Sequence, residues 1–315
     1  MMIGSFLFKQ KARAALKGNW QNALVVTFFA GVFLTAAQLA QSVALKDVQA
    51  VVNSLQALMG TLGTEMTNAQ SQQVLELYNK LFAAIGSIPY STYALLLGLN
   101  GLALVVSPVL AIGCNHYFIR LIKGTDIGVK DGLIGRASIW LKALWLHVRM
   151  FVQIFLWSLL LIIPGVIAAL RYSMATYFLA EDPSISAGEA LRRSKEAMKV
   201  KGRKPGYLML LISFEGWNLL ISIVQILLLG MVGTVVTLVA AQFMSLMLTV
   251  YMNASCAAFY YPLSSADGLD DLVSTVRSRM RQAGISETDI NAAGFGERDT
   301  MGDEEEENAD GGDDE

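Results

Sequence analysis

Runs of apolar residues alternate with short polar stretches along most of the chain. Six such runs lie at residues 22–45, 94–119, 140–163, 165–180, 206–229 and 234–260. Each approaches or exceeds the length of about 20 residues that a helix needs to cross a hydrocarbon core of about 30 Å. The pattern therefore predicts an all-α polytopic membrane protein, with about six transmembrane helices within residues 22–262.

The number of crossings depends on Pro164 and Gly165, which interrupt a long apolar stretch. The flanking residues 148–163 and 165–180 can form one kinked span or two spans joined by a turn. Length permits both arrangements, so the charge of the neighbouring segments has to decide between them.

Two segments rich in Lys and Arg flank this stretch, at residues 120–149 and 171–204. Short basic loops stay on the cytoplasmic side of a membrane. A single crossing would place one of the two segments outside, whereas a hairpin at Pro164-Gly165 keeps both inside. We therefore predict a Pro-Gly hairpin between spans three and four, with both chain termini in the cytoplasm.

Four further segments are predicted to lie outside the hydrocarbon core. Residues 1–21 alternate basic and apolar positions, which is typical of an amphipathic helix in the membrane interface. Residues 46–93 are an extracytoplasmic insert, in which two stripes at three- and four-residue spacing predict a helical hairpin. Residues 263–284 predict a cytoplasmic amphipathic helix, and residues 285–315 are an acidic tail whose composition predicts disorder.

A cytoplasmic basic helix is predicted within residues 184–204. Ser186 and Glu189 have the spacing of a capping box at its start. Its basic residues are expected to contact anionic lipid, unless they serve only to fix the topology. They are Arg192, Arg193, Lys195, Lys199, Lys201, Arg203 and Lys204.

Three polar residues within the spans are candidates for an intramembrane pair or site: Arg171, Glu215 and Asn253. A charge in lipid is costly and generally has a partner. Arg171 and Glu215 fall at similar depths from the cytoplasmic side, so the prediction is that they pair, and the alternative is that they do not touch. Such a pair would either hold helices together or form part of a substrate or proton site.

Two surfaces are candidates for self-association. The apolar stripes of residues 46–93 must cover each other, the membrane surface or another copy of the protein. Ala36, Ala40 and Ala44 recur at every fourth residue, a spacing that lets two helices approach closely. The expected partners are therefore membrane lipids and a second copy of the protein, bound through either surface in a homo-oligomer.

Composition agrees with a membrane protein, since 54% of the residues are hydrophobic and 16% are charged. The net charge of −2 hides a basic body, because eleven acidic residues and one arginine lie within residues 297–315. Cys114 and Cys256 lack any metal-site spacing. No catalytic motif is present either, so we expect no enzyme, metal or cofactor, and no nucleic-acid partner.

Five segments together carry a family pattern. They are KARAALKGNWQNAL, FLWSLLLIIPGVIAALRYSMATYFLAEDP, SAGEALRRSKEAMKVK, SFEGW and YMNASCAAFY. In order and spacing they resemble the DUF975 family over most of residues 9–262, and they are similar in pattern to the membrane domain of some glycerophosphodiester phosphodiesterases. The resemblance implies a multi-span protein of a bacterial cytoplasmic membrane, with no established activity. Residues 46–93, the acidic tail and Glu215 depart from the family's pattern.

Two functions of different classes remain. The amphipathic segments around the spans favour a non-enzymatic integral membrane scaffold or accessory protein, acting by self-association, lipid contact or a partner complex. The alternative is a small-solute or ion transporter or channel that uses polar residues near the Pro-Gly hairpin.

Overall fold

The computed structural model describes residues 2–61, 68–125, 128–200, 202–232 and 234–264, together with residues 273–274, 277–278, 281–282, 284 and 286–290. All regular structure in these residues is helical, which confirms the predicted all-α class. Six segments are long and apolar enough to cross a membrane: Trp20–Ala44, Tyr90–Ile122, Val129–Leu160, Ile162–Glu181, Arg203–Leu228 and Val239–Ser264. The prediction of a multi-pass membrane protein with about six spans is therefore confirmed.

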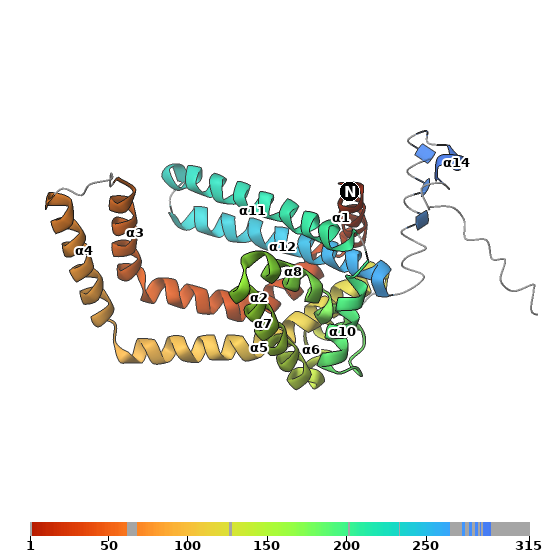
Figure 1. Cartoon of the computed structure of the whole chain (residues 1–315), viewed down its shortest axis with the longest axis horizontal. Helices are drawn as coiled ribbons and strands as arrows, with labels where there is room; N and C mark the ends of the chain where they lie inside the picture. Colours follow the sequence, from red (N-terminus) through yellow and green to blue (C-terminus); the bar gives the residue numbers. More distant parts are fainter. Residues whose placement is uncertain are drawn as a thin grey trace, which may run out of the picture.

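Two pairs of long helices form the body of the protein (Figure 1). Helices α2 (Trp20–Ala44) and α5 (Tyr90–Ile122) lie side by side, and α11 (Arg203–Val232) packs on α12 (Thr234–Ser264). At about 1.5 Å per residue, α5 is about 50 Å long and exceeds the hydrocarbon core of a membrane.

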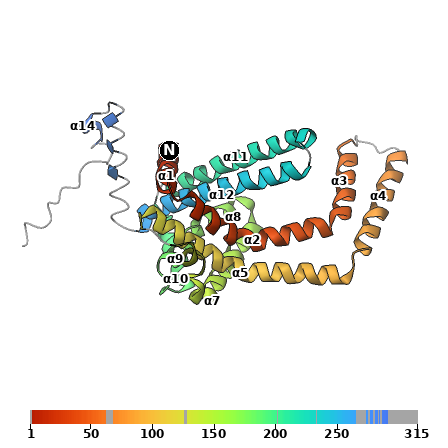
Figure 2. The same cartoon turned by 180° about the vertical axis from the view of Figure 1, so that it is seen from behind.

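Two shorter helices, α3 (Lys46–Thr61) and α4 (Asn68–Gly86), connect α2 to α5. They pack against each other and stand across one end of the α2–α5 pair, far from α1 (Met2–Leu16) and α10 (Ala187–Ala197) (Figures 1 and 2). Since they run across the direction of the spans, they do not add to the membrane crossings.

Most buried side chains gather at the opposite end, which we call the packed end. There α12 is buried at every residue from Ala254 to Tyr260, and it contacts α1 (Met2–Leu16), α5 and α9 (Ala175–Glu181). Farther along, α2, α5 and α11 expose many large apolar side chains. Lipid tails are as apolar as these side chains, so such surfaces are suited to face lipid.

Helix α1 is predicted to be an interfacial helix. In the structure, much of its apolar side packs against other helices. Leu7, Ala12 and Leu16 are buried, and Phe8 meets Phe259 of α12 edge-on with ring centroids 5.1 Å apart. Gly18 then turns the chain into α2 with a φ of 90°, a left-handed conformation that favours glycine.

The turn after the third span lies at Leu161 and not at the predicted Pro164-Gly165. Leu161 is extended, with φ −166° and ψ 153°, between α7 (Trp140–Leu160) and α8 (Ile162–Tyr172). Pro164 and Gly165 belong to the first turn of α8. Proline is tolerated there because its missing N–H would have no partner within the helix.

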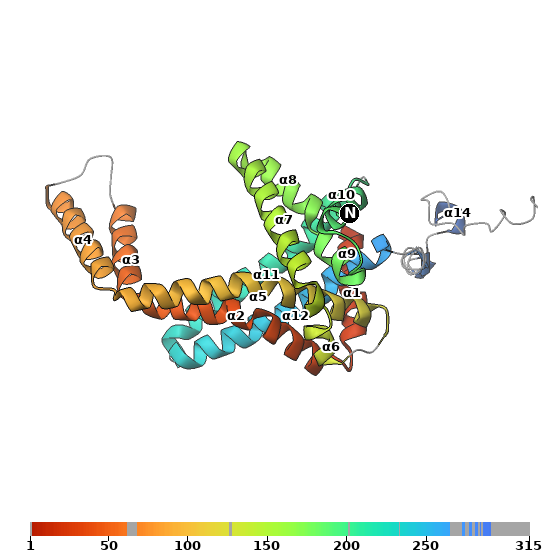
Figure 3. The same cartoon turned by 90° about the horizontal axis from the view of Figure 1, so that it is seen from below.

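Helices α7 and α8 pack closely and lean away from the α2–α5 pair (Figure 3). A Cβ atom at Gly165 would lie only 2.3 Å from Ser158 Oγ of α7. The glycine therefore serves the close approach of the two helices on either side of the turn, a role that differs from the one predicted for it.

The fourth span is broken at Ser173 and Met174, between α8 and α9. The hydroxyl of Ser194, on α10 (Ala187–Ala197), bridges the break: it accepts a hydrogen bond from Met174 N at 3.2 Å and donates one to Arg171 O at 2.9 Å. Ser194 is fully buried. It thereby satisfies backbone groups that the break leaves without helical partners.

The buried side of α10 is covered by protein, since this helix contacts α7, α8 and α9. Its buried residues are Ala187, Ala190, Leu191 and Ser194. Helix α10 therefore uses its apolar face to dock on the spans.

Most residues of the predicted helix at 263–284 and of the acidic tail at 285–315 lie outside the described residues. Within the tail, the structure describes one short helix, α14 (Glu287–Ile290).

Helix α5 meets α6 (Val129–Ile134) backbone to backbone through two glycines. A Cβ atom at Gly113 would lie 2.6 Å from Gly132 O, and a Cβ atom at Gly132 would lie 2.9 Å from Tyr117 Cβ. The 3₁₀-helix η1 (Ala137–Ile139) then leads into α7.

We predict that Gly113→Ala lowers the free energy of unfolding by about 1–3 kcal/mol, because α6 must move away from α5. Gly101→Ala on the same helix is the matched control, since its Cβ would meet no atom within 4 Å. That change should be neutral or stabilise the helix by about 0.5–1 kcal/mol. Thermal unfolding in mild detergent measures both, and equal midpoints for the two variants would contradict the close α5–α6 contact.

Candidate functional site

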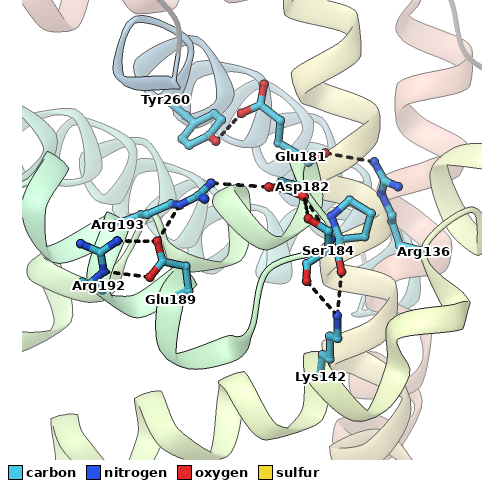
Figure 4. Close-up of polar contacts among 10 residues, drawn as sticks. Arg136, Lys142, Glu181, Asp182, Ser184, Glu189, Arg192, Arg193 and Tyr260 are labelled. Carbon is cyan, nitrogen blue, oxygen red and sulfur yellow. Dashed lines mark hydrogen bonds and ion pairs between the residues drawn. The ribbon is translucent and has the colours of Figure 1, made fainter.

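A cluster of charged residues surrounds the segment from Ala180 to Ser184, where α9 leads to α10 at the packed end (Figure 4). Two basic side chains donate to backbone carbonyls of this segment. Arg136 Nε donates to Ala180 O at 2.9 Å, and Lys142 Nζ donates to Pro183 O at 2.9 Å. Basic groups at the end of a helix stabilise carbonyls that have no helical partner.

The side chain of Glu181 connects three helices. Its Oε1 forms an ion pair with Lys123, which follows the end of α5, and its Oε2 accepts a hydrogen bond from the Tyr260 hydroxyl of α12 at 2.5 Å. Tyr260 is fully buried and stacks on Tyr177 of α9. Glu181 therefore ties α9 to both α5 and α12.

Asp182 links this segment to α10. Its Oδ1 accepts hydrogen bonds from Ser184 N and Oγ, and its Oδ2 lies 3.5 Å from Arg193 Nη1. The hydrogen bonds from Ser184, with a further contribution from Arg193, hold the pKa of the Asp182 carboxyl below its usual value.

At the start of α10, Ser186 Oγ accepts a hydrogen bond from Glu189 N at 3.2 Å, which is the backbone half of the predicted capping box. The Glu189 carboxylate instead binds the guanidinium groups of Arg192 and Arg193 at 2.7 Å and 3.0 Å. Hydrogen bonds first from Arg192 and then from Arg193 lower the pKa of Glu189 to about 2.

Several residues of the predicted anionic-lipid surface have partners within the protein. Arg192 and Arg193 are paired with carboxylates, and Arg203 Nη1 donates to Ala197 O at 2.7 Å. Lys195 and Lys199 are exposed and Lys204 is partly buried, and these three form no ion pair within the described residues. Lys201 lies outside those residues.

The predicted Arg171–Glu215 pair is not formed. Arg171 is partly buried on α8, Glu215 is exposed on α11, and no ion pair joins them among the described residues. The similar depths of Arg171 and Glu215 in the spans were therefore not sufficient to predict an ion pair. The helices α8 and α11 are in contact with each other, so proximity of the two helices alone does not form the pair.

The structure places Asn253 in a different polar group. Asn253 Nδ2 lies 3.8 Å from Cys114 Sγ, at a cavity of about 370 Å³ between α2, α5, α7 and α12. Asn115 and His147 also line the cavity. His147 Nδ1 lies 2.9 Å from Ala143 O, so Nδ1 carries the proton and donates it to that carbonyl.

Residues 148–267 match the profile of the family described as DUF975, a protein of unknown function. This segment of the chain is similar to the DUF975 family. The predicted family is confirmed, although the matched segment is shorter than the predicted residues 9–262. No curated protein and no solved structure matches the chain.

The DUF975 segment contains the acidic part of the charged cluster but not all of its basic residues. Glu181, Asp182, Arg193 and Tyr260 lie within it, whereas the basic partners Lys123, Arg136 and Lys142 precede it in the sequence. The cluster thus joins the DUF975 segment to the helices before it.

Sequence reasoning missed this cluster, although all of its basic residues were counted in the two basic segments. The sequence AEDPS places two carboxylates and a proline directly after a helix, and this was the available signal. Which basic residues reach these groups depends on how α5, η1 and α7 pack, which local periodicity does not encode.

Proposed function

We propose that this DUF975 protein is a non-enzymatic integral membrane scaffold or accessory protein, acting by self-association, lipid contact or a partner complex. One observation carries the proposal: α4 has an apolar face that the rest of the described chain leaves uncovered. The hairpin of α3 and α4 is the part of the molecule that reaches farthest from the packed end.

Helix α4 carries two adjoining apolar stripes. Val74, Leu77 and Leu81 are partly buried in the hairpin with α3. A second stripe, spaced at three and four residues, is exposed: Leu75 at 57%, Tyr78 at 48%, Phe82 at 66% and Ile85 at 42%. Together the stripes take up about half of the helix circumference at 3.6 residues per turn.

The sequence left three possible partners for these stripes: the other helix of the hairpin, the membrane surface or another copy of the protein. Packing of α3 against α4 uses only the first stripe of α4. The rings of Tyr78 and Phe82 lie side by side, with centroids 6.1 Å apart. Contiguous exposed apolar surface with aromatic side chains is typical of sites that bind protein or membrane.

We expect Tyr78→Ser with Phe82→Ser to convert an oligomer into a monomer, as measured by light scattering in mild detergent. The control is Gln72→Ser with Asn79→Ser on the polar side of α4, which should leave the mass unchanged. Quenching of Phe82→Trp fluorescence by brominated lipid would instead identify a lipid-facing stripe. A monomeric wild-type protein without such quenching would contradict the proposal.

We further infer that the protein lies in a bacterial cytoplasmic membrane with both termini and the packed end in the cytoplasm. The surplus of Lys and Arg in residues 120–149 and 171–204 supports this orientation. Helix α8 returns the chain to α10, so both basic segments lie at the packed end.

Lys195→Cys in a background with Cys114→Ala and Cys256→Ala tests the orientation. An impermeant thiol reagent should label this position only after the cells are lysed. Labelling of intact cells would show the opposite orientation.

The cavity of about 370 Å³ favours transport of a small solute or ion as a second candidate function. Polar groups of Asn115, His147 and Asn253 line it within the spans, where polar side chains often mark a pathway. Arg171 and Glu215 are not among its lining residues.

A transport pathway requires water at this cavity. Asn253→Cys in the same cysteine-free background should then react with a small water-soluble thiol reagent. Ile226→Cys is the control, because Ile226 is 72% exposed on the apolar surface of α11 and would face lipid. Absence of reaction at position 253 would argue against transport.

A further inference from the structure

A small half-enclosed pocket lies beside the charged cluster at the packed end. Its volume is about 170 Å³, and the last turns of α5, Arg136 before η1 and the end of α9 form its walls. The lining residues are His116, Ile119, Arg120, Lys123, Arg136 and Glu181.

The walls of the pocket carry more positive than negative charge. Lys123, Arg120 and Arg136 face a single carboxylate, that of Glu181. Glu181 is already bound to Lys123 and to the Tyr260 hydroxyl. The two guanidinium groups therefore have no carboxylate partner in the pocket.

Neutral acceptors hold the guanidinium group of Arg136 in place. Nε donates to Ala180 O at 2.9 Å, and Nη2 donates to His116 Nδ1 at 3.1 Å and to Glu181 O at 3.4 Å. Since a guanidinium can only donate, His116 accepts with Nδ1 and is neutral. These contacts orient Arg136 without compensating its charge, and they leave Nη1 without a partner among the described residues.

Arg120 contributes a second uncompensated charge. Its side chain is exposed and forms neither a hydrogen bond nor an ion pair within the described part of the chain. It lies close enough to repel Arg136 electrostatically. Asp182 offsets part of the charge of Arg136, but its carboxylate is also engaged by Arg193 and Ser184. An anion placed between the two guanidinium groups would offset this repulsion.

We propose that this pocket binds a phosphate group, either as inorganic phosphate or as the headgroup phosphate of a lipid. Guanidinium groups match the oxygens of phosphate with paired donors. Pockets for drug-sized ligands measure about 300–1,000 Å³, so about 170 Å³ suits a single phosphate group and not a nucleotide. The exposed lysines Lys195 and Lys199 are not among the residues that line this pocket.

The last turn of α5 contains Arg120, so the pocket lies where a span ends and where lipid headgroups are found. Both sources of phosphate can reach such a position. The shared chemistry is an oxyanion held by Arg120 and Arg136.

The test uses the full chain in a zwitterionic detergent at low chloride, with binding measured by calorimetry and by the shift in unfolding temperature. The probes are inorganic phosphate and a short-chain phosphatidic acid. Arg120→Gln should weaken binding about ten-fold, the loss of one charge-assisted hydrogen bond. It should leave the unfolding temperature of the unliganded protein unchanged or raise it slightly, because the Arg120 side chain has no partner among the described residues and its loss relieves the repulsion of Arg136.

Lys195→Gln is the charge-matched control at the same end of the molecule, and its binding should equal that of the wild type. Arg136→Lys keeps the charge but loses the paired donors, and it should also bind more weakly. Saturable binding of inorganic phosphate would identify the free ion as the ligand, whereas binding of phosphatidic acid alone would identify a lipid headgroup. Binding of neither probe, or equal weakening by Lys195→Gln, would overturn the proposal.

Discussion

The buried hydroxyl of Ser194 joins the fourth span to the helix that follows it. The hydroxyl accepts a hydrogen bond from the N–H of Met174 and donates one to the carbonyl of Arg171, across the break between α8 and α9. Backbone groups away from water must be hydrogen-bonded within the protein. A broken span at this position therefore depends on α10 being docked against it.

The rest of the packed end follows from this contact. With α10 fixed by Ser194, Arg193 lies beside Asp182, and α9 ends where Glu181 can meet Lys123 and Tyr260. The same arrangement places Arg136 against the carbonyl of Ala180 and forms one wall of the phosphate pocket. One hydrogen-bonded break thus organises both the charged cluster and the pocket beside it.

Hydrophobic periodicity was sufficient to predict the six spans, because span length is set by the membrane itself. It could not place the turn, since Pro164 suits the first turn of a helix as well as it suits a turn. It also could not reveal Ser194, because one serine in a basic helix looks the same whether it faces water or a backbone break. The predicted Arg171–Glu215 pair failed for a related reason: depth restricts which residues can meet, but packing decides which faces do.

Hydrogen exchange at the Met174 amide tests the central claim most directly. Ser194→Ala removes the acceptor of that amide, at a cost of about 1–3 kcal/mol for a buried unsatisfied group. The account predicts exchange about five- to one-hundred-fold faster over α9 in this variant, and no change in Ser222→Ala, whose exposed hydroxyl bonds only within its own helix. Equal protection of Met174 in the wild type and in Ser194→Ala would contradict it.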